Sequence, residues 1–278
     1  MSFKIIVDSC CDLTSAMLSE SHFQSVPLTI RVGDDVIVDD QTFDQANLLW
    51  KMKANEKAPA TACPSPAQYL EAMDCGVDNI YVVTLSALLS GSHNSAAQAR
   101  MMYLEEHPEA RIHIFNSCSA SAGEVMLALK IKELAERGLP FNQVVTEVSR
   151  YISEMNTLFV LEDLDNLRKN GRLSKLQAIV TGTLKIKLLM GATPEGEIYK
   201  RGQALSTKQA LSKMISIMAE DEKHKGRTLC IAHCNCLDRA FFLKELALKS
   251  CQFGDIIIVD TGGISTVYAN DGGIVAAY

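Results

Sequence analysis

Long apolar runs are absent from this sequence. No stretch approaches the roughly twenty consecutive apolar residues that an α-helix needs to cross a bilayer. The first residues, MSFKIIVDSC, also lack the extended apolar core of a secretory signal, because their short apolar part ends at Asp8. We therefore expect neither a transmembrane segment nor export.

Motifs for nucleotides and nucleic acids are missing as well. The sequence contains neither GxxxxGK[ST] nor GxGxxG, so the standard phosphate-binding loops are absent. Basic residues are not in excess, since 27 Lys and Arg stand against 33 Asp and Glu, for a net charge of −6. This balance argues against a partner made of nucleic acid.

Disulfide spacing is absent although the chain has nine cysteines. An odd number of thiols in a chain of 278 residues without a signal peptide indicates a reduced, cytoplasmic protein. Cys230-x-x-His233-Cys234-x-Cys236 is a candidate metal cluster, but no second Cys/His pair follows at zinc-finger spacing. Buried core thiols with a partnered histidine are the interpretation that we favour, and we expect no metal.

The residues that are present predict an α/β protein. Hydrophobic residues make up 47% of the chain and charged residues 22%, which is enough for a substantial core. Four units of strand followed by helix precede residue 150, which is typical of a Rossmann-like parallel sheet covered by helices. We place this first domain at residues 1–155. We expect a second α/β domain with a mixed or antiparallel sheet at 156–278.

The segment from Tyr81 to Ala97 organises the rest of the chain. A buried strand ends near Ser86, and the turn Ser90-Gly91-Ser92 then opens a helix. Free N–H groups at a helix start and nearby hydroxyls favour an anion, which is a phosphate, a carboxylate or an oxyanion. A serine-rich helix cap without a ligand is the alternative.

Two further patterns carry chemistry. His93 follows Ser90 at a spacing that brings side chains together on a helix, so a serine hydrolase or acyltransferase is an alternative function. Ser90 is not in a GxSxG elbow, however, because Leu88 occupies the first glycine position. A basic corner, which is either solvated or a contact for an anion or a protein, consists of Arg168, Lys169, Arg172 and Lys175.

Six motifs follow one another along the chain, and they are Asp8-Ser9-x-x-Asp12-Leu13, Thr61-x-x-Pro64, Leu89-Ser90-Gly91-Ser92, Asn116-Ser117, Gly171-Arg172-Leu173-Ser174-Lys175 and the glycine-rich tail. In this order they resemble the DegV family of bacterial fatty-acid-binding proteins, which includes the lipid-carrying subunit of fatty acid kinase. The resemblance covers nearly the whole chain and implies two α/β domains that bury one acyl chain.

The resemblance implies roles for single residues. Thr61 and Ser90 match the family's carboxylate-binding threonine and serine, and Gly91 and Ser92 lie beside them. Further residues that we expect to line the lipid site are Ser9, Ser119, Arg172 and Tyr268. The implied function is a non-catalytic carrier of a long-chain fatty acid such as palmitate, with the fatty acid as its ligand and no other cofactor.

The sequence departs from the family pattern at three positions. Leu205 replaces an arginine of the kinase-linked members, which argues against a partnership with the catalytic subunit of fatty acid kinase. Tyr268 stands where a histidine is usual, and Asn116 where an aspartate is usual. We expect lipid binding to survive these changes.

Overall fold

Four parallel strands form the first sheet of the structure, a computed structural model that describes residues 2–77, 79–173 and 186–278. Their order is β2-β1-β6-β7, and all three pairings are parallel, as the sequence predicted. The two central strands, β1 and β6, are buried on both faces, which explains why they are mostly apolar. The strands are β1 (Phe3–Asp8), β2 (Phe23–Val26), β6 (Asn79–Thr84) and β7 (Arg111–Asn116).

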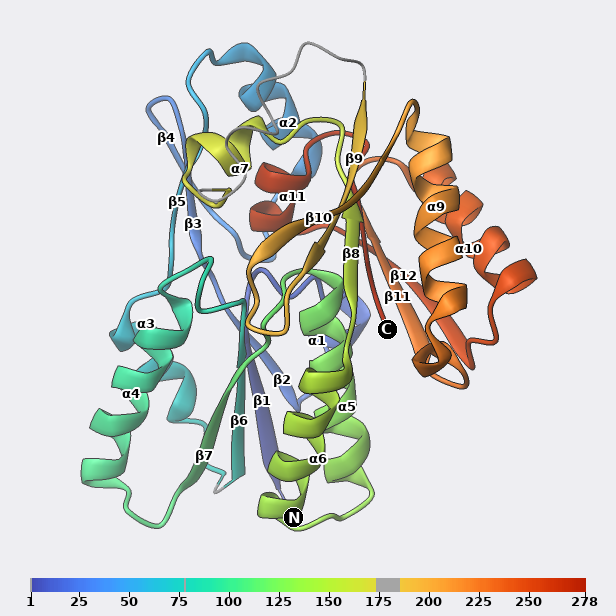
Figure 1. The fold of residues 1–278 in the computed structure, drawn as a ribbon. Helices are drawn as coiled ribbons and strands as arrows, with labels where there is room; N and C mark the ends of the chain where they lie inside the picture. Colours follow the sequence, from blue (N-terminus) through green and yellow to red (C-terminus); the bar gives the residue numbers. More distant parts are fainter. Residues whose placement is uncertain (1, 78, 174–185) are drawn as a thin grey trace.

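Helices cover the two faces of this sheet (Figure 1). Ile6 of β1 faces a core that includes residues of α3 and α4, whereas Ile5 and Val7 face a core that includes residues of α5 and α6. Helix α3 begins with a capping box that Ser65 and Gln68 form. The helices of this half are α1 (Ser15–Leu18), α3 (Pro66–Met73), α4 (Ser92–Glu106), α5 (Ala122–Glu136) and α6 (Phe141–Glu154).

A small antiparallel sheet, in the order β4-β3-β5, extends from this half together with α2 (Gln45–Ala54). Strands β3 and β4 form a hairpin whose turn contains Gly33 with φ +61°. Thr61 lies in the short strand β5, where it pairs with Ile30. The strands are β3 (Thr29–Val32), β4 (Asp35–Val38) and β5 (Ala60–Ala62).

The last strands form a six-stranded sheet in the order β10-β9-β8-β13-β11-β12. Only the pair β11–β12 is parallel among these, so the sheet is mixed, in agreement with the sequence. The strands are β8 (Thr157–Val160), β9 (Lys187–Ala192), β10 (Ile198–Ala204), β11 (Thr228–His233), β12 (Asp255–Asp260) and β13 (Ile274–Ala277). The helical segments are α7 (Asp165–Lys169), α9 (Thr207–Glu220), η2 (Glu222–His224), α10 (Leu237–Ser250) and α11 (Gly263–Ala269).

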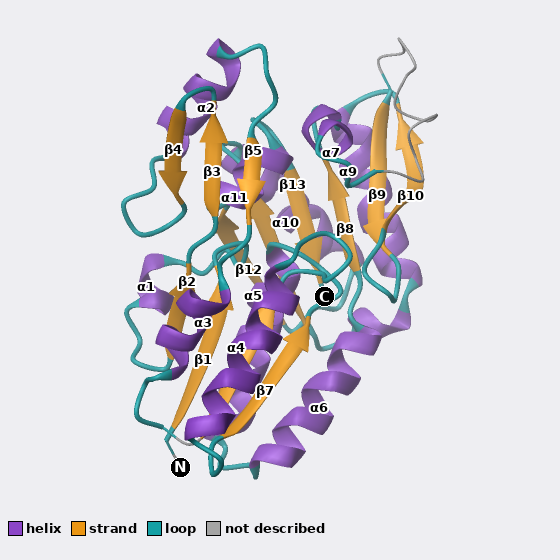
Figure 2. Cartoon of the chain, turned by 90° about the vertical axis from the view of Figure 1, so that its left-hand side faces the viewer, coloured by secondary structure: helices purple, strands orange, loops and turns teal. Residues whose placement is uncertain are grey.

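Helix α5 connects the two larger sheets. It contacts β1 and β6 on one side and β11 and β13 on the other. One core cluster therefore contains Val7 and Tyr81 together with Cys230 and Ala277. The side view in Figure 2 shows the small sheet above the parallel sheet, next to the strands of the mixed sheet. The boundary between residues 155 and 156 stays a prediction, because the packing is continuous across it.

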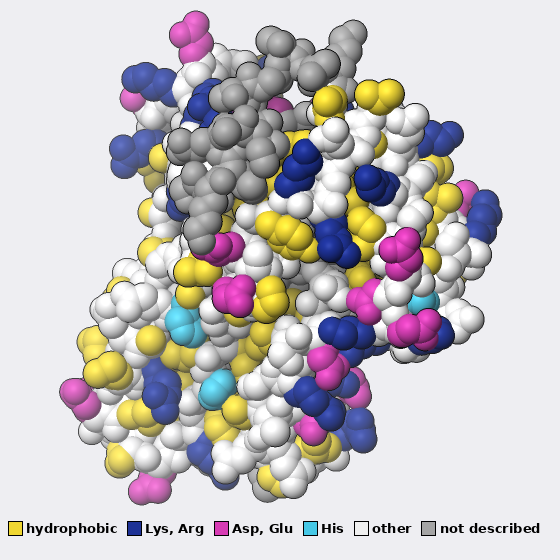
Figure 3. All heavy atoms as spheres, in the orientation of Figure 1, with side chains coloured by type: hydrophobic (Ala, Val, Ile, Leu, Met, Phe, Trp, Pro, Cys, Tyr) yellow, Lys and Arg dark blue, Asp and Glu magenta, His cyan; other side chains and the backbone are white. Residues whose placement is uncertain are grey.

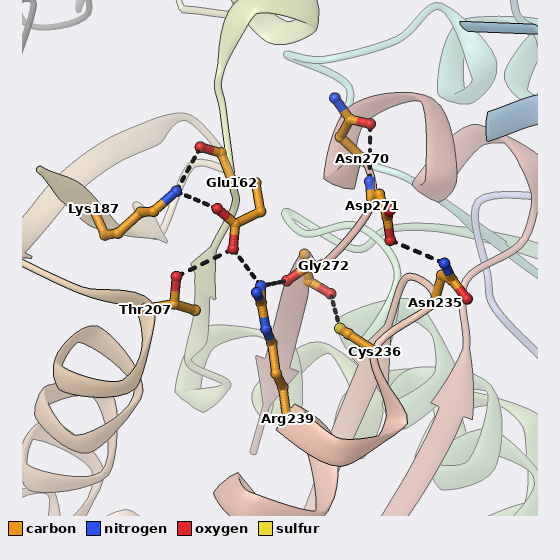
Figure 4. A network of polar contacts seen from close by, with 10 residues as sticks. Glu162, Lys187, Thr207, Asn235, Cys236, Arg239, Asn270, Asp271 and Gly272 are labelled. Atoms are coloured by element: carbon orange, nitrogen blue, oxygen red, sulfur yellow. Dashed lines mark hydrogen bonds and ion pairs between the residues drawn. The ribbon is translucent and has the colours of Figure 1, made fainter. Parts of the chain in front are cut away.

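A polar network fixes the loop after β8 against the end of the chain (Figure 4). Glu162 forms ion pairs with Lys187 and Arg239 and accepts a hydrogen bond from Thr207 at 3.1 Å. Arg239 also donates to the carbonyl of Gly272 at 2.6 Å. The network thereby ties β9 and α10 to the turn that follows α11. Within the described ranges, no helix is long and apolar enough to span a membrane.

Candidate functional site

An apolar cavity lies where the mixed sheet faces the loops that follow β6 and β7. Its volume is about 100 Å³. Leu85 and Leu89 line it from the loop after β6, and Ser119 and Ala120 from the loop after β7. The remaining wall comes mainly from apolar side chains of the mixed sheet, α7 and α11, among them Phe159, Leu161, Leu167, Ile264 and Val275.

The cavity runs along β8, so one of its ends lies near each end of this strand. Thr157, Phe159 and Leu161 all line it, so it follows one face of β8 for about 13 Å at roughly 3.3 Å per residue. Leu161 lies three residues before Leu164, the N-cap of α7, and Arg172 lies two residues after Asn170, the C-cap of that helix. Thr157 lies at the other end, one residue before Leu158, which pairs with Gly191 of β9 next to Ala192.

Polar side chains gather at the α7 end. The hydroxyl of Thr61 lies 2.8 Å from the phenol oxygen of Tyr268. The guanidinium of Arg172 lies 5.8 Å from the centre of the Tyr268 ring, and its Nε donates to the carbonyl of Leu89 at 3.2 Å. These contacts connect the Thr61 strand with the loop that carries Ser90. An arginine beside hydroxyls at the end of an apolar cavity is suited to a carboxylate.

The predicted turn Ser90-Gly91-Ser92 begins α4, as expected. The Oγ of Ser90 accepts a hydrogen bond from the backbone N–H of Ser92 at 3.2 Å. Ser92 itself is fully buried, and its hydroxyl donates to Asp8 at 2.5 Å and lies 2.6 Å from the phenol oxygen of Tyr69. Ser92 therefore holds the turn to the core, while half-buried Ser90 remains nearer the surface.

Some of the other predicted residues line the cavity, and one of them lies in the core beside it. Tyr268, Arg172 and Ser119 line the cavity, and the Ser119 hydroxyl bonds to that of Thr157 at 2.7 Å. Ser9 is buried and accepts a hydrogen bond from the backbone N–H of Leu28 at 3.0 Å, so it stabilises a neighbouring turn. The structure thus brings Thr61, Tyr268 and Arg172 together near one end of the cavity, whereas Ser119 lies at the other end. Thr61 and Ser90 are not among the residues that line the cavity.

The arrangement of Ser90 and His93 does not resemble a catalytic pair. Nδ1 of His93 lies 3.4 Å from the hydroxyl of Thr84. The Ser90 hydroxyl accepts from Ser92, as described above. Burial lowers the pKa of His93. The described contacts therefore direct the two side chains to different partners.

Four buried carboxyl groups below the cavity were missed by the sequence analysis. They belong to Asp8, Asp12, Asp39 and Glu124, and each is at least 95% buried. Burial raises the pKa of Asp12 to about 7 and that of Asp39 to about 6. Burial, reinforced by the neighbouring Asp8, raises the pKa of Glu124 well above its ordinary value. The only available signal was the position of Asp8 and Asp12 directly after an apolar strand.

These carboxyl groups support the cavity rather than line it. Asp39 accepts hydrogen bonds from the backbone N–H groups of Gly263 and Ile264 at the start of α11. Asp12 accepts a hydrogen bond from the backbone N–H of Gly262, the residue before Gly263, at 2.7 Å. Because α11 also carries Tyr268, the acidic cluster fixes the helix that supplies one side of the polar end.

The candidate metal cluster is made of core residues. Cys230, Cys234 and Cys236 are buried, and His233 lies 3.3 Å from Asp260, as the favoured interpretation predicted. In the part of the chain that the structure describes, no three His, Cys, Asp or Glu side chains are arranged to hold a metal ion.

The basic corner is partly neutralised. Arg168 and Lys169 both pair with Asp165, and Lys175 lies outside the described residues. Over the described part of the face in Figure 3, basic and acidic side chains alternate. Asn116 accepts hydrogen bonds from the backbone N–H groups of Ala87 and Cys118 and so stabilises the neighbouring loop.

Comparisons with known proteins identify the family of this chain. A family described as "Uncharacterised protein, DegV family COG1307" matches residues 2–278. A DegV domain-containing protein of Streptococcus gordonii is 36% identical over 280 residues, which cover 100% of this chain and 99% of the relative.

Two solved structures are similar over the whole chain. A DegV family protein from Ruminococcus gnavus, solved with vaccenic acid, is 46% identical with a TM-score of 0.97. The Fatty Acid Kinase (Fak) B3 protein of Streptococcus pneumoniae, loaded with linoleic acid, is 37% identical with a TM-score of 0.92. Each comparison covers 100% of this chain and 99% of the other. The chain therefore belongs to the DegV family.

Proposed function

We propose that this protein is a non-enzymatic carrier that binds one long-chain fatty acid, such as palmitate, with its tail in the apolar cavity. The observation that carries the proposal is the mostly apolar cavity itself, which has the Arg172 guanidinium and the Tyr268 phenol at one end. The relatives solved with vaccenic and linoleic acids support it. An amphiphile with one anionic head is the ligand class that matches such an asymmetric site.

The tail supplies most of the binding free energy. Burying a methylene group is worth about 0.8 kcal/mol, so a chain of about fifteen gives roughly 12 kcal/mol before ordering costs. The cavity of about 100 Å³ is smaller than the roughly 300 Å³ at the lower end of ordinary ligand pockets. Entry of the tail therefore requires the lining side chains to move apart.

The head group supplies orientation. In our proposal the carboxylate accepts hydrogen bonds from the hydroxyls of Thr61 and Ser90, and Gly91 and Ser92 shape the turn beside it. Tyr268 and Arg172 lie next to these groups and complete the polar end. Hydrogen bonds to a charged group contribute about 1.5–3 kcal/mol each, which is enough to select one direction of the acid.

A kinase partner remains a separate question. The similarity to the Fak B3 protein favours one, whereas Leu205, at the position of the family's arginine, is 77% exposed and apolar. We expect weak or no phosphorylation of the bound acid by the catalytic subunit of a fatty acid kinase. Restored transfer in a Leu205→Arg variant would show that this residue is the obstacle.

Native mass spectrometry tests the proposal. The protein is delipidated, reloaded with palmitate and measured, with hexadecanol as a control that has a tail of the same length but no carboxylate. We expect one palmitate per chain and weaker retention of hexadecanol. If repeated reloading with palmitate yields only the ligand-free mass, the proposal is wrong. Hydrolysis of p-nitrophenyl esters that is lost in Ser90→Ala would instead favour the acyl hydrolase.

A further inference from the structure

We propose that the β9–β10 hairpin determines the length of the acyl chain, and that Ala192 and Ile198 are the residues that limit it. The inference rests on the proposed function, because it assigns a role to the end of the cavity opposite the carboxylate. It follows from the strand register, from the contacts of the hairpin turn and from the sizes of the two side chains.

The register places the hairpin at the far end of the cavity. Phe159 pairs with Met190, and both belong to the core cluster on the cavity side of the mixed sheet. Two residues further along, Thr157 and Ala192 lie on the same face because side chains alternate along a strand. A tail that starts at Arg172 and follows β8 therefore ends at Thr157 and Ala192.

The turn of the hairpin closes this end. Residues 193–197 form the turn, which is held by a hydrogen bond from Gly196 to the carbonyl of Thr193 at 2.9 Å. The hydroxyl of Ser86, in the loop after β6, donates to the carbonyl of Gly196 at 2.8 Å. The turn is thereby fixed to the opposite half of the molecule, and it forms a wall that the end of the tail meets.

Ala192 and Ile198 are the residues of this wall whose side chains can be made larger or smaller by substitution. They face each other as a register pair, and both line the cavity. Gly196 also lines it but cannot carry a side chain, since a Cβ there would lie 2.3 Å from the Ser86 hydroxyl and 2.8 Å from the Cα of Cys118. Ser119 and Thr157 bond to each other, so they offer no free polar group to the tail.

Two variants that should shift the preferred acid length in opposite directions test the inference. Ala192→Leu fills the far end, and Ile198→Ala enlarges it. The measurement is competition binding across saturated acids from decanoate to stearate, with a melting curve for each variant. Ala67→Leu on α3 is the matched control, because Ala67 is exposed and does not line the cavity.

We expect Ala192→Leu to shift the preference to shorter acids, with a loss of about fourfold in affinity for each methylene that no longer fits. Ile198→Ala should shift it to longer acids, and Ala67→Leu should leave it unchanged. Folded variants that bind with the wild-type length profile would overturn the inference and leave the proposed function intact. A wild-type protein that binds none of the acids would overturn the proposed function as well.

Discussion

Thr61 and Tyr268 show how single residues build the polar end of the cavity. They are separated by 207 positions in the chain, yet their hydroxyl oxygens lie 2.8 Å apart. Thr61 is fixed by the pairing of β5 with β3, and Tyr268 by α11, whose first N–H groups bind Asp39. Two separately anchored hydroxyls can meet a carboxylate with little loss of side-chain entropy.

Replacement of Thr61 by valine tests this role. Thr61→Val keeps the shape of the side chain and removes its hydroxyl, so we expect palmitate affinity to fall by about 1.5–3 kcal/mol, or roughly 10- to 150-fold. Isothermal titration measures the change. Thr146→Val, on the exposed side of α6, should have no effect. Equal affinities for Thr61→Val and the wild type would exclude the hydroxyl from binding.

At the scale of single residues, the sequence predicted the local structure around a residue better than its contacts with distant parts of the chain. The turn Ser90-Gly91-Ser92 was expected to begin a helix, and it does. That Ser92 faces Asp8 in the core, whereas Ser90 does not, depends on strands brought together by folding. The buried position of Glu124 was equally inaccessible, because charged residues in a first helical turn are usually solvated.

At the scale of the elements, the β9–β10 hairpin depends on one backbone conformation. Gly196 has φ +89°, a value that glycine adopts easily and other residues rarely do. Its carbonyl binds Ser86 across the cavity, so the hairpin and the loop after β6 are held together at this residue.

We expect Gly196→Ala to lower the free energy of unfolding by about 1–3 kcal/mol more than Gly138→Ala does. Gly138 is a matched control, since its φ is +78° but a Cβ there would have no neighbour within 4 Å. Both variants carry similar backbone strain, and only the first produces a clash. Urea denaturation measures the difference, and equal losses would show that the turn is not tightly packed.

Local signals predicted most of the elements. The capping box at Ser65, the Gly33 turn and the strand–helix alternation all depend on neighbours in the chain. The short strand β5 was missed because it pairs with β3, about thirty positions away, and contains only Ala60–Ala62. The cavity face of β8 was hidden for a similar reason, since every residue of that strand is buried.

At the scale of the whole molecule, two of the buried carboxyl groups connect the first half of the chain to the second. Asp12 in the first half binds Gly262 in the second, and Asp39 binds the start of α11. Their protonation is thus coupled to the association of the halves.

The free energy of unfolding should fall as pH rises from about 4 to 7. Burial raises the pKa of Asp12 from 3.8 to about 7 and that of Asp39 to about 6, so the native state keeps protons that the unfolded chain loses near pH 4. The stabilisation is complete below the unfolded pKa and is lost as pH passes the folded pKa. For Asp12 it amounts to roughly 4 kcal/mol.

Urea titrations at several pH values measure this slope. Asp12→Asn cannot ionise, so its slope should be smaller than that of the wild type. A wild-type stability that rises from pH 4 to 7 would show that other groups outweigh the buried acids. An Asp12→Asn slope equal to the wild-type slope would exclude Asp12 as a cause.

A crystal structure of the protein loaded with palmitate tests the central claim most directly. The account predicts an acyl chain along β8 between the halves, with its carboxylate bonded to the hydroxyls of Thr61 and Ser90 and its last carbons beside Ala192. A palmitate bound at the surface, a reversed chain, or a loaded crystal whose cavity remains closed would contradict it.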